Sequence, residues 1–209
     1  MAYSVVCVSG PDGAHMREVA KGVSERLGFA LVDEQIILRA AAEAGVAPDE
    51  VADVETRRSL VERALEAVSP NIDMASFALA GVGYVPSQRS VSDELRELIR
   101  TAIEETAARG RVVIVAHAAS HALGLRPDVL RVLVTASEET RRSRVASDQD
   151  LDAKAAARLV GESDAGRADY LRRFYGAKSE LPTQYDVVVS TDRLSPDDAV
   201  SLVAQAATC

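Results

Sequence analysis

Short runs of apolar, β-branched residues alternate along the chain with longer segments in which apolar residues recur at helical spacing. Such runs, bounded by turn residues, predict buried strands, and the alternation predicts an α/β fold with a parallel sheet. The predicted strands are residues 3–9, 29–33, 111–116, 129–135 and 185–190. Five predicted helices are residues 15–27, 34–44, 48–68, 91–109 and 150–174. Two more are predicted from their caps: one follows Ser137, and the other starts at Pro196 with Ser195 as its cap.

Two of the predicted connections are much longer than a single crossover helix requires. About 75 residues separate the second and third strands and about 50 separate the fourth and fifth, whereas connections in compact domains are usually short. We therefore predict one domain over residues 1–209 with two substrate-covering inserts, at 34–90 and at 148–178. Glycines interrupt the helical pattern of the second insert near residues 161–166, so we expect a hinge there.

The charge balance argues against two classes of partner. Lys and Arg number 24 against 32 Asp and Glu, a formal net charge of −8, which opposes general affinity for nucleic acid or for an anionic membrane. No run of about 18 apolar residues is present, so we expect no membrane span, and residues 1–10 do not resemble a signal peptide. Cys7 and Cys209 do not suggest a disulfide framework, and we expect a cytoplasmic protein.

The turn after the first predicted strand carries the most telling candidate for a ligand site. It reads Ser-Gly-Pro-Asp-Gly-Ala-His-Met-Arg over residues 9–17, and a glycine turn between a strand and a helix is where the backbone N–H groups of a P-loop surround phosphate. Against the pattern G-x-x-x-x-G-K-[ST], Met16 stands at the lysine position and Arg17 at the magnesium-anchoring hydroxyl position. An ordinary strand-to-helix turn, which needs glycines for its geometry alone, is the alternative.

Several strings resemble the cytidylate-kinase-like proteins, a branch of the P-loop nucleoside monophosphate kinases. The resemblance spans most of the chain and is most specific in the string that matches the family's lid. It implies a five-stranded parallel sheet flanked by helices, with an acceptor-binding insert at 34–90 and a lid at 148–178. The matching strings are residues 9–20, 29–37, 127–132, 164–176 and 185–191.

The resemblance also implies a donor site. The donor, ATP with Mg²⁺, would be bound by Gly10, Gly13, Ala14, His15, Met16 and Arg17. Arg17 would replace the missing lysine, and Arg141 and Arg144, three residues apart on one helical face, would approach the phosphates. Arg167 in the lid would close on the transferred phosphoryl group as charge develops.

These arginine assignments compete with plainer ones. The cluster at 141–144 equally suits a solvated helix face paired with Glu138 and Glu139. For Arg167 the alternative is a surface salt bridge.

The acceptor site implied by the resemblance departs from the family. A small CMP-like acceptor would be bound by Asp33, His117 and Asp169, but His117 stands where related kinases often carry an arginine. The strand at 112–115 also offers no aspartate for magnesium. Because charged clamps matter greatly in phosphoryl transfer, we expect weak or absent kinase activity.

The three histidines, His15, His117 and His121, follow the ends of two strands that the resemblance makes neighbours. Ligands bind at that edge of an open α/β sheet, and three imidazoles there could hold a transition metal. Polar residues at a helix start are the preferred interpretation, so we assign no metal ligand.

Three functions follow from these observations. The first is a nucleotide-binding protein that transfers a phosphoryl group from ATP to a small CMP-like acceptor. The second is a catalytically inactive kinase-fold module with a regulatory or scaffolding role. The third is a homo-oligomeric structural protein that associates through the helices at 48–68 and 91–109.

Overall fold

The computed structural model describes residues 3–33, 91–115, 119–178 and 180–209. The helices predicted at 34–44 and 48–68, the insert at 34–90 and His117 lie outside these described residues. None of the described helices is both long and apolar enough to cross a membrane.

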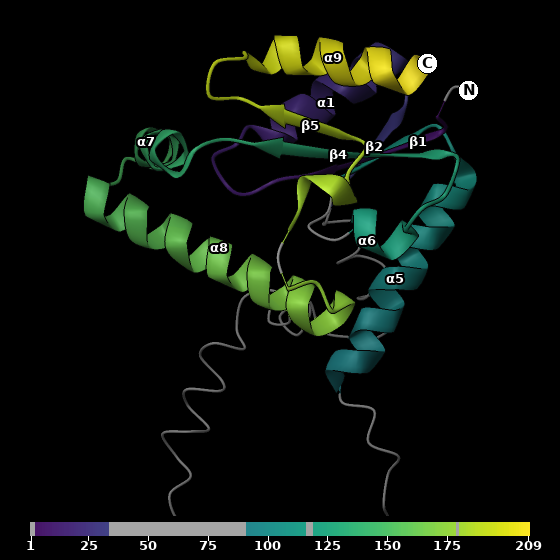
Figure 1. Ribbon diagram of the computed structural model, residues 1–209, viewed down its shortest axis with the longest axis horizontal. Coiled ribbons are helices and arrows are strands. Elements are labelled where there is room, and N and C mark those ends of the chain that lie inside the picture. The colour runs from purple at the N-terminus through teal and green to yellow at the C-terminus, as the bar shows by residue number, and fades with distance from the viewer. Residues whose placement is uncertain (1–2, 34–90, 116–118, 179) are drawn as a thin grey trace, which may run out of the picture.

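In the part of the chain that the structure describes, five parallel strands form the centre of the fold in the order β2-β3-β1-β4-β5 (Figure 1). The strands are β1 Val5–Ser9, β2 Ala30–Val32, β3 Val112–Val115, β4 Val129–Thr135 and β5 Val187–Ser190. In the middle, Val5 of β1 pairs with Val112 on one side and with Val129 on the other. All of β1 is buried, as expected for a strand covered on both faces. The predicted five-stranded parallel sheet is confirmed.

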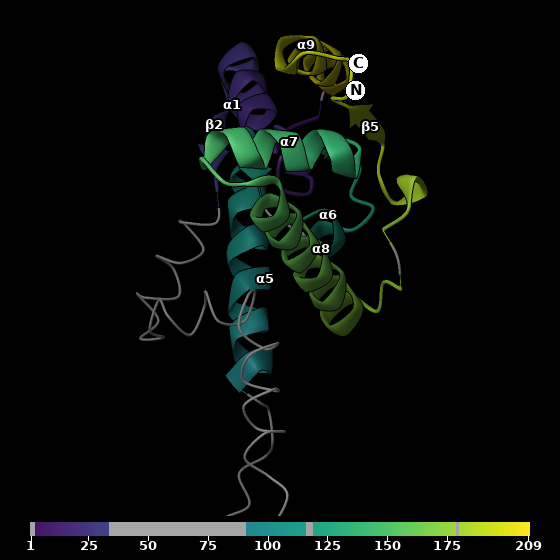
Figure 2. The same cartoon turned by 90° about the vertical axis from the view of Figure 1, so that its left-hand side faces the viewer.

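Helices cover both faces of this sheet (Figures 1 and 2). They are α1 Met16–Leu27, α5 Val91–Arg109, α6 Ala119–Leu123, α7 Glu138–Asp148, α8 Ala153–Tyr175 and α9 Pro196–Thr208, with a 3₁₀ turn η1 at Pro182–Gln184. α1 and α9 lie together over one face, whereas α5, α6 and α8 lie on the other side (Figure 1). Because side chains alternate along β1, Val6 and Val8 enter the core under α1 and α9, and Val5 and Cys7 enter the core under α5 and α6.

Helix α8 runs without a break through Gly161 and Gly166, so the interruption predicted at 161–166 is wrong. A glycine inside a helix costs about 1 kcal/mol relative to alanine, which a long, packed helix can absorb. The start of α8 is capped by Asp152, whose carboxylate accepts a hydrogen bond from the N–H of Ala155 at 2.7 Å. Farther along, side chains of α8 bond to residues remote in sequence, and these contacts override the local preference.

Candidate functional site

The loop from Gly10 to His15 joins β1 to α1 and fits closely against β4 and α7. A Cβ at Gly10 would lie 2.3 Å from the carbonyl oxygen of Val134, so glycine is required there. Gly13 has a φ of +77°, and a Cβ at this position would lie 2.8 Å from the carbonyl oxygen of Arg141. His15 precedes α1 with a φ of 61°, a left-handed conformation that residues other than glycine rarely adopt. The loop is therefore closely fitted to its surroundings.

Side chains from α7, α8 and the segment after β5 donate hydrogen bonds to the carbonyl oxygens of this loop. The pairs are Arg167 with the Gly10 oxygen at 3.4 Å, Arg141 with Asp12 at 3.3 Å, Arg144 with Gly13 at 3.0 Å and Thr191 with Ala14 at 3.1 Å. The three arginines that the sequence placed near the phosphates thus do converge on the loop, but on its carbonyl oxygens. Thr191 was missed, although its place directly after a predicted strand was a usable signal.

The N–H side of the loop is different. The backbone N–H groups of Gly13, His15 and Met16 have no hydrogen-bond partner among the described residues. In a trans peptide the N–H points opposite to the preceding carbonyl, so the bonds to the Asp12 and Ala14 oxygens turn the N–H groups of Gly13 and His15 away from those side chains. These donors lie at the positive end of the α1 dipole, a location that favours an anion.

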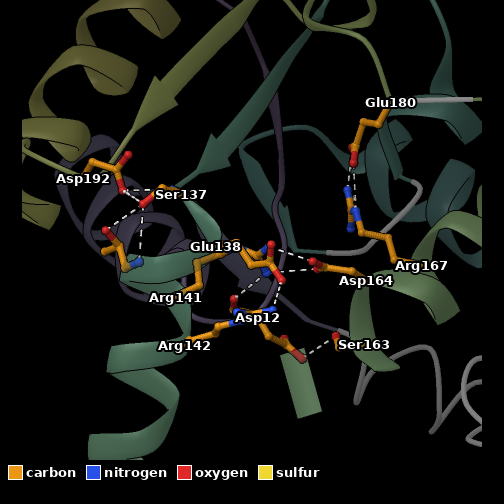
Figure 3. Close-up of polar contacts among 11 residues, drawn as sticks. Asp12, Ser137, Glu138, Arg141, Arg142, Ser163, Asp164, Arg167, Glu180 and Asp192 are labelled. Carbon is orange, nitrogen blue, oxygen red and sulfur yellow. Dashed lines mark hydrogen bonds and ion pairs between the residues drawn. The ribbon is translucent and has the colours of Figure 1, made fainter. Parts of the chain in front are cut away.

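Two of the arginines are also paired with carboxylates (Figure 3). Arg141 donates two hydrogen bonds to Asp164, at 2.9 and 2.6 Å, and Arg167 donates two to Glu180, also at 2.9 and 2.6 Å. Both arginine side chains are only 7% exposed. The solvated-face alternative therefore does not hold for Arg141, and the pair formed by Arg167 is buried rather than on the surface.

Burial and pairing act in opposite directions on Glu180. Burial raises the pKa of its carboxyl, but the hydrogen bonds and charge of Arg167 outweigh burial, so the pKa lies below its ordinary value of 4.5. The Tyr185 hydroxyl also donates to Glu180, and burial together with this carboxylate raises the pKa of Tyr185 far above its ordinary value of 10.0. At pH 7 Glu180 is thus ionised and Tyr185 neutral, so Arg167 belongs to a neutral ion pair.

A pocket of about 240 Å³ lies between the loop and the second half of α8. The polar residues that line it are Arg141, Asp164, Arg167, Lys178 and Glu180. Lys178 is one of three lysines in the chain and forms no ion pair among the described residues. The sequence limits any catalytic lysine to Lys21, Lys154 or Lys178, and nothing local distinguishes Lys178 from the other two. It supplies this pocket with a positive charge that no described carboxylate neutralises.

Other predicted site residues are distributed differently. Arg17 lies 3.9 Å from Asp33, so the structure brings together one proposed donor residue and one proposed acceptor residue. Asp169 instead pairs with Arg172 and Arg173 of its own helix, at 2.5 and 2.6 Å. These pairs leave Asp169 as part of the surface of α8 and give it no contact with the loop.

The structure also tests the predictions made for Met16 and for Arg142 of the arginine cluster. The Met16 side chain is 6% exposed and lies in the core under α1 and α9, so only its backbone is available to a ligand. Arg142 pairs with Glu138 on the exposed surface of α7, as the solvated-face alternative expected for this cluster.

The histidines do not form a recognisable site in the described residues. His15 Nδ1 lies 3.1 Å from Glu18, and the His121 ring lies between Tyr175 and Tyr185, with centroids 5.6 and 6.3 Å away. Both ring nitrogens of His121 are buried without a hydrogen-bond partner in the described structure, and burial lowers its pKa. No group of three His, Cys, Asp or Glu among the described residues is placed to hold a metal ion.

The parallel sheet with a glycine loop between its central strand and the first helix defines a protein of the P-loop kinase fold. More narrowly, the chain belongs to the cytidylate kinase-like family, whose sequence model matches residues 5–193. The fold is shared with several solved structures. An uncharacterized protein from Eubacterium ventriosum is 14% identical, with 97% of each chain covered and a TM-score of 0.67. A sugar kinase from a Janibacter species is 15% identical over 97% of this chain and 93% of its own, with a TM-score of 0.55. A shikimate kinase from Bacteroides thetaiotaomicron is 13% identical over 97% of each chain, with a TM-score of 0.52.

Proposed function

We propose that this protein binds the phosphates of a nucleoside triphosphate, ATP, at the loop between β1 and α1 and transfers a phosphoryl group slowly to a small CMP-like acceptor. The observation that carries this proposal is the asymmetry of the loop. Its carbonyl oxygens are taken by side chains, whereas the N–H groups of Gly13, His15 and Met16 have no partner in the described structure. Such donors at a helix start suit phosphate oxygens, and family membership supports the acceptor class.

Positioning and charge are what the chain must supply, because in-line phosphoryl transfer needs little covalent chemistry from the protein. The loop N–H groups would orient the donor phosphates, and Lys178 would add positive charge from the pocket wall. Arg141 and Arg167 supply less net charge than unpaired arginines would, because each is bound to a carboxylate. Met16 leaves the lysine role in the loop unfilled. Because a single arginine clamp is worth roughly 10³–10⁵ in kcat, we expect low turnover.

The described residues do not fit a magnesium ion held by the protein. Arg17 occupies the place of the anchoring hydroxyl, and the described part of the chain contains no cluster of three metal-ligating side chains. Asp33 is paired with Arg17. We therefore assign no catalytic step to Mg²⁺ and expect any magnesium dependence to follow the nucleotide.

Calorimetric titration of the full chain tests the binding step. ATP and pyrophosphate should bind and adenosine should not, because the loop recognises phosphate. Lys178→Gln should weaken ATP binding several-fold, whereas Lys154→Gln, which removes an exposed lysine at the start of α8, should not. If neither ATP nor pyrophosphate binds the protein or raises its melting temperature, the proposal is overturned.

A coupled assay with nucleoside monophosphates tests the transfer step. We expect turnover below the common kinase range of roughly 1–100 s⁻¹. Turnover within that range would contradict the expected weakness. Binding of ATP without turnover on any monophosphate would favour the second candidate, a catalytically inactive kinase-fold module, which the paired state of Arg141 and Arg167 also supports.

A further inference from the structure

Thr191 joins several elements behind the loop. It is 1% exposed and follows β5 directly. Its hydroxyl lies 3.1 Å from the carbonyl oxygen of Ala14 and 3.2 Å from that of Thr135, and it accepts a hydrogen bond from Arg144 Nη1 at 3.0 Å. Its backbone N–H donates to Thr135 at 2.8 Å, and its carbonyl oxygen accepts from Arg144 Nη2 at 2.6 Å. The loop, β4, β5 and α7 therefore meet at one buried hydroxyl.

Arg144 completes this arrangement from α7. The Nη1 that reaches Thr191 also donates to the carbonyl oxygen of Gly13 at 3.0 Å. Its partners are carbonyl and hydroxyl oxygens, and it forms no ion pair with any described carboxylate. The guanidinium therefore places its positive charge on the carbonyl side of the loop, where it lies close enough to the Glu18 and Asp192 carboxylates to help lower their pKa without pairing with either.

His15 is the residue whose conformation this arrangement restrains. With a φ of 61° it is in a left-handed conformation that costs of order 1–3 kcal/mol and persists only where the surrounding structure enforces it. Thr191 holds the carbonyl oxygen of the peptide that joins Ala14 to His15. The N–H of that same peptide consequently points to the opposite side, where no described residue accepts it.

We propose that Thr191 and Arg144 are positioning residues for the loop: Thr191 holds the carbonyl oxygen of Ala14, Arg144 holds the Thr191 hydroxyl, and together they direct the His15 N–H at the phosphate of the ligand. This inference rests on the proposed function. Arg144 then acts on the phosphate through Thr191 and the Ala14–His15 peptide and not by direct contact, which differs from the role that the family resemblance implied for it.

Paired substitutions at Thr191 test this inference with pyrophosphate as the probe. Thr191→Val removes the hydroxyl but keeps size and charge, and should weaken pyrophosphate binding roughly three- to tenfold, the equivalent of one hydrogen bond. Thr191→Ser keeps the hydroxyl and should bind within about twofold of the parent. Val203→Ala, on the buried face of α9, is the control for lost stability and should leave affinity unchanged. Titrations are made at a temperature where circular dichroism shows every variant folded.

The outcomes separate the two proposals. If the parent protein binds neither pyrophosphate nor ATP, the proposed function fails. If the parent binds pyrophosphate and Thr191→Val binds it equally well, the positioning role is overturned. Should Thr191→Val not fold, amide NMR of the parent protein decides: pyrophosphate should shift the His15 and Gly13 amide signals most. Larger shifts at the Arg144 Nε–H signal would indicate direct contact and refute the inference.

Discussion

Replacing Glu180 by glutamine should destabilise the protein strongly, although the two side chains have nearly the same volume and differ only in the negative charge. The Arg167 side chain is only 7% exposed and stays charged in the variant. Its two hydrogen bonds to Glu180, at 2.9 and 2.6 Å, are shorter than its 3.4 Å bond to the carbonyl oxygen of Gly10. Removing one partner of a buried ion pair costs about 3–5 kcal/mol, because the remaining charge is left uncompensated. The Glu180 side chain is 20% exposed and glutamine retains an acceptor, so we expect about 2–3 kcal/mol.

The assay is chemical denaturation at pH 7, with a matched substitution on the surface of α8. Arg158 and Glu162 form a pair at 3.9 Å with side chains 78% and 67% exposed, so Glu162→Gln should cost at most about 0.5 kcal/mol. At about 2–4 °C per kcal/mol for a chain of this size, Glu180→Gln should lower the melting temperature by roughly 4–12 °C. A loss for Glu180→Gln no larger than that for Glu162→Gln would refute the view that the Arg167 charge is buried and paired.

The same variant predicts a pH dependence. The pKa of Glu180 is lower in the folded protein than its ordinary value of 4.5, so its ionised form stabilises the folded state. This contribution is fully present above pH 4.5 and is lost as the pH falls through the lower folded pKa. The difference in unfolding free energy between the parent and Glu180→Gln should therefore be constant from pH 7 to about 5 and shrink in acid. A difference that grows in acid would contradict the assigned ionisation.

Three further predictions concern other positions. Met16→Lys should cost several kcal/mol by denaturation and bring no gain in ATP affinity by calorimetry, because this side chain is 6% exposed in the core. Gly10→Ala should destabilise by about 1–3 kcal/mol, since its Cβ would lie 2.3 Å from the Val134 oxygen, whereas Gly161→Ala, whose Cβ meets no atom within 4 Å, should stabilise by about 1 kcal/mol. The pKa of His121, measured by NMR, should lie below its ordinary value of 6.5. Because the unfolded chain then binds the proton more readily than the folded protein, this residue should reduce stability as the pH falls below 6.5. A midpoint above 6.5 would contradict its buried environment.

The centre of the sheet could be predicted from the sequence because strands β1, β3 and β4 are buried on both faces. Their β-branched runs stand out from the amphipathic segments around them, and β4 begins and ends at the predicted residues, Val129 and Thr135. The predicted break in α8 was wrong because helix continuity there depends on tertiary contacts. Ser163 bonds to Asp12, which lies 151 residues away, and no local pattern reports such a contact.

The side chains around the loop were predictable only in part. The arginines were identified from the family resemblance, and spacing added only that Arg141 and Arg144 share a helical face. Their partners Asp164, Glu180 and Thr191 were not identified, because each pairing depends on how separate segments meet in space. Met16 is different, since its burial was readable. It lies three, four and seven positions before Val19, Ala20 and Val23, and this spacing marks the core face of α1. The alignment with the P-loop lysine obscured that pattern.

Arg144 shows how a loop without its lysine can still favour an anion. The carboxylates of Asp164 and Glu180 neutralise Arg141 and Arg167, whereas the partners of Arg144 are uncharged oxygens. Arg144 donates to the Thr191 hydroxyl, which donates to the carbonyl oxygen of Ala14, and such a chain of hydrogen bonds polarises the Ala14–His15 peptide so that the His15 N–H becomes a stronger donor. The positive end of α1 adds to the same effect. The loop can thus attract phosphate through the polarised His15 N–H, while the guanidinium lies on the opposite side of the peptide and does not contact the ligand.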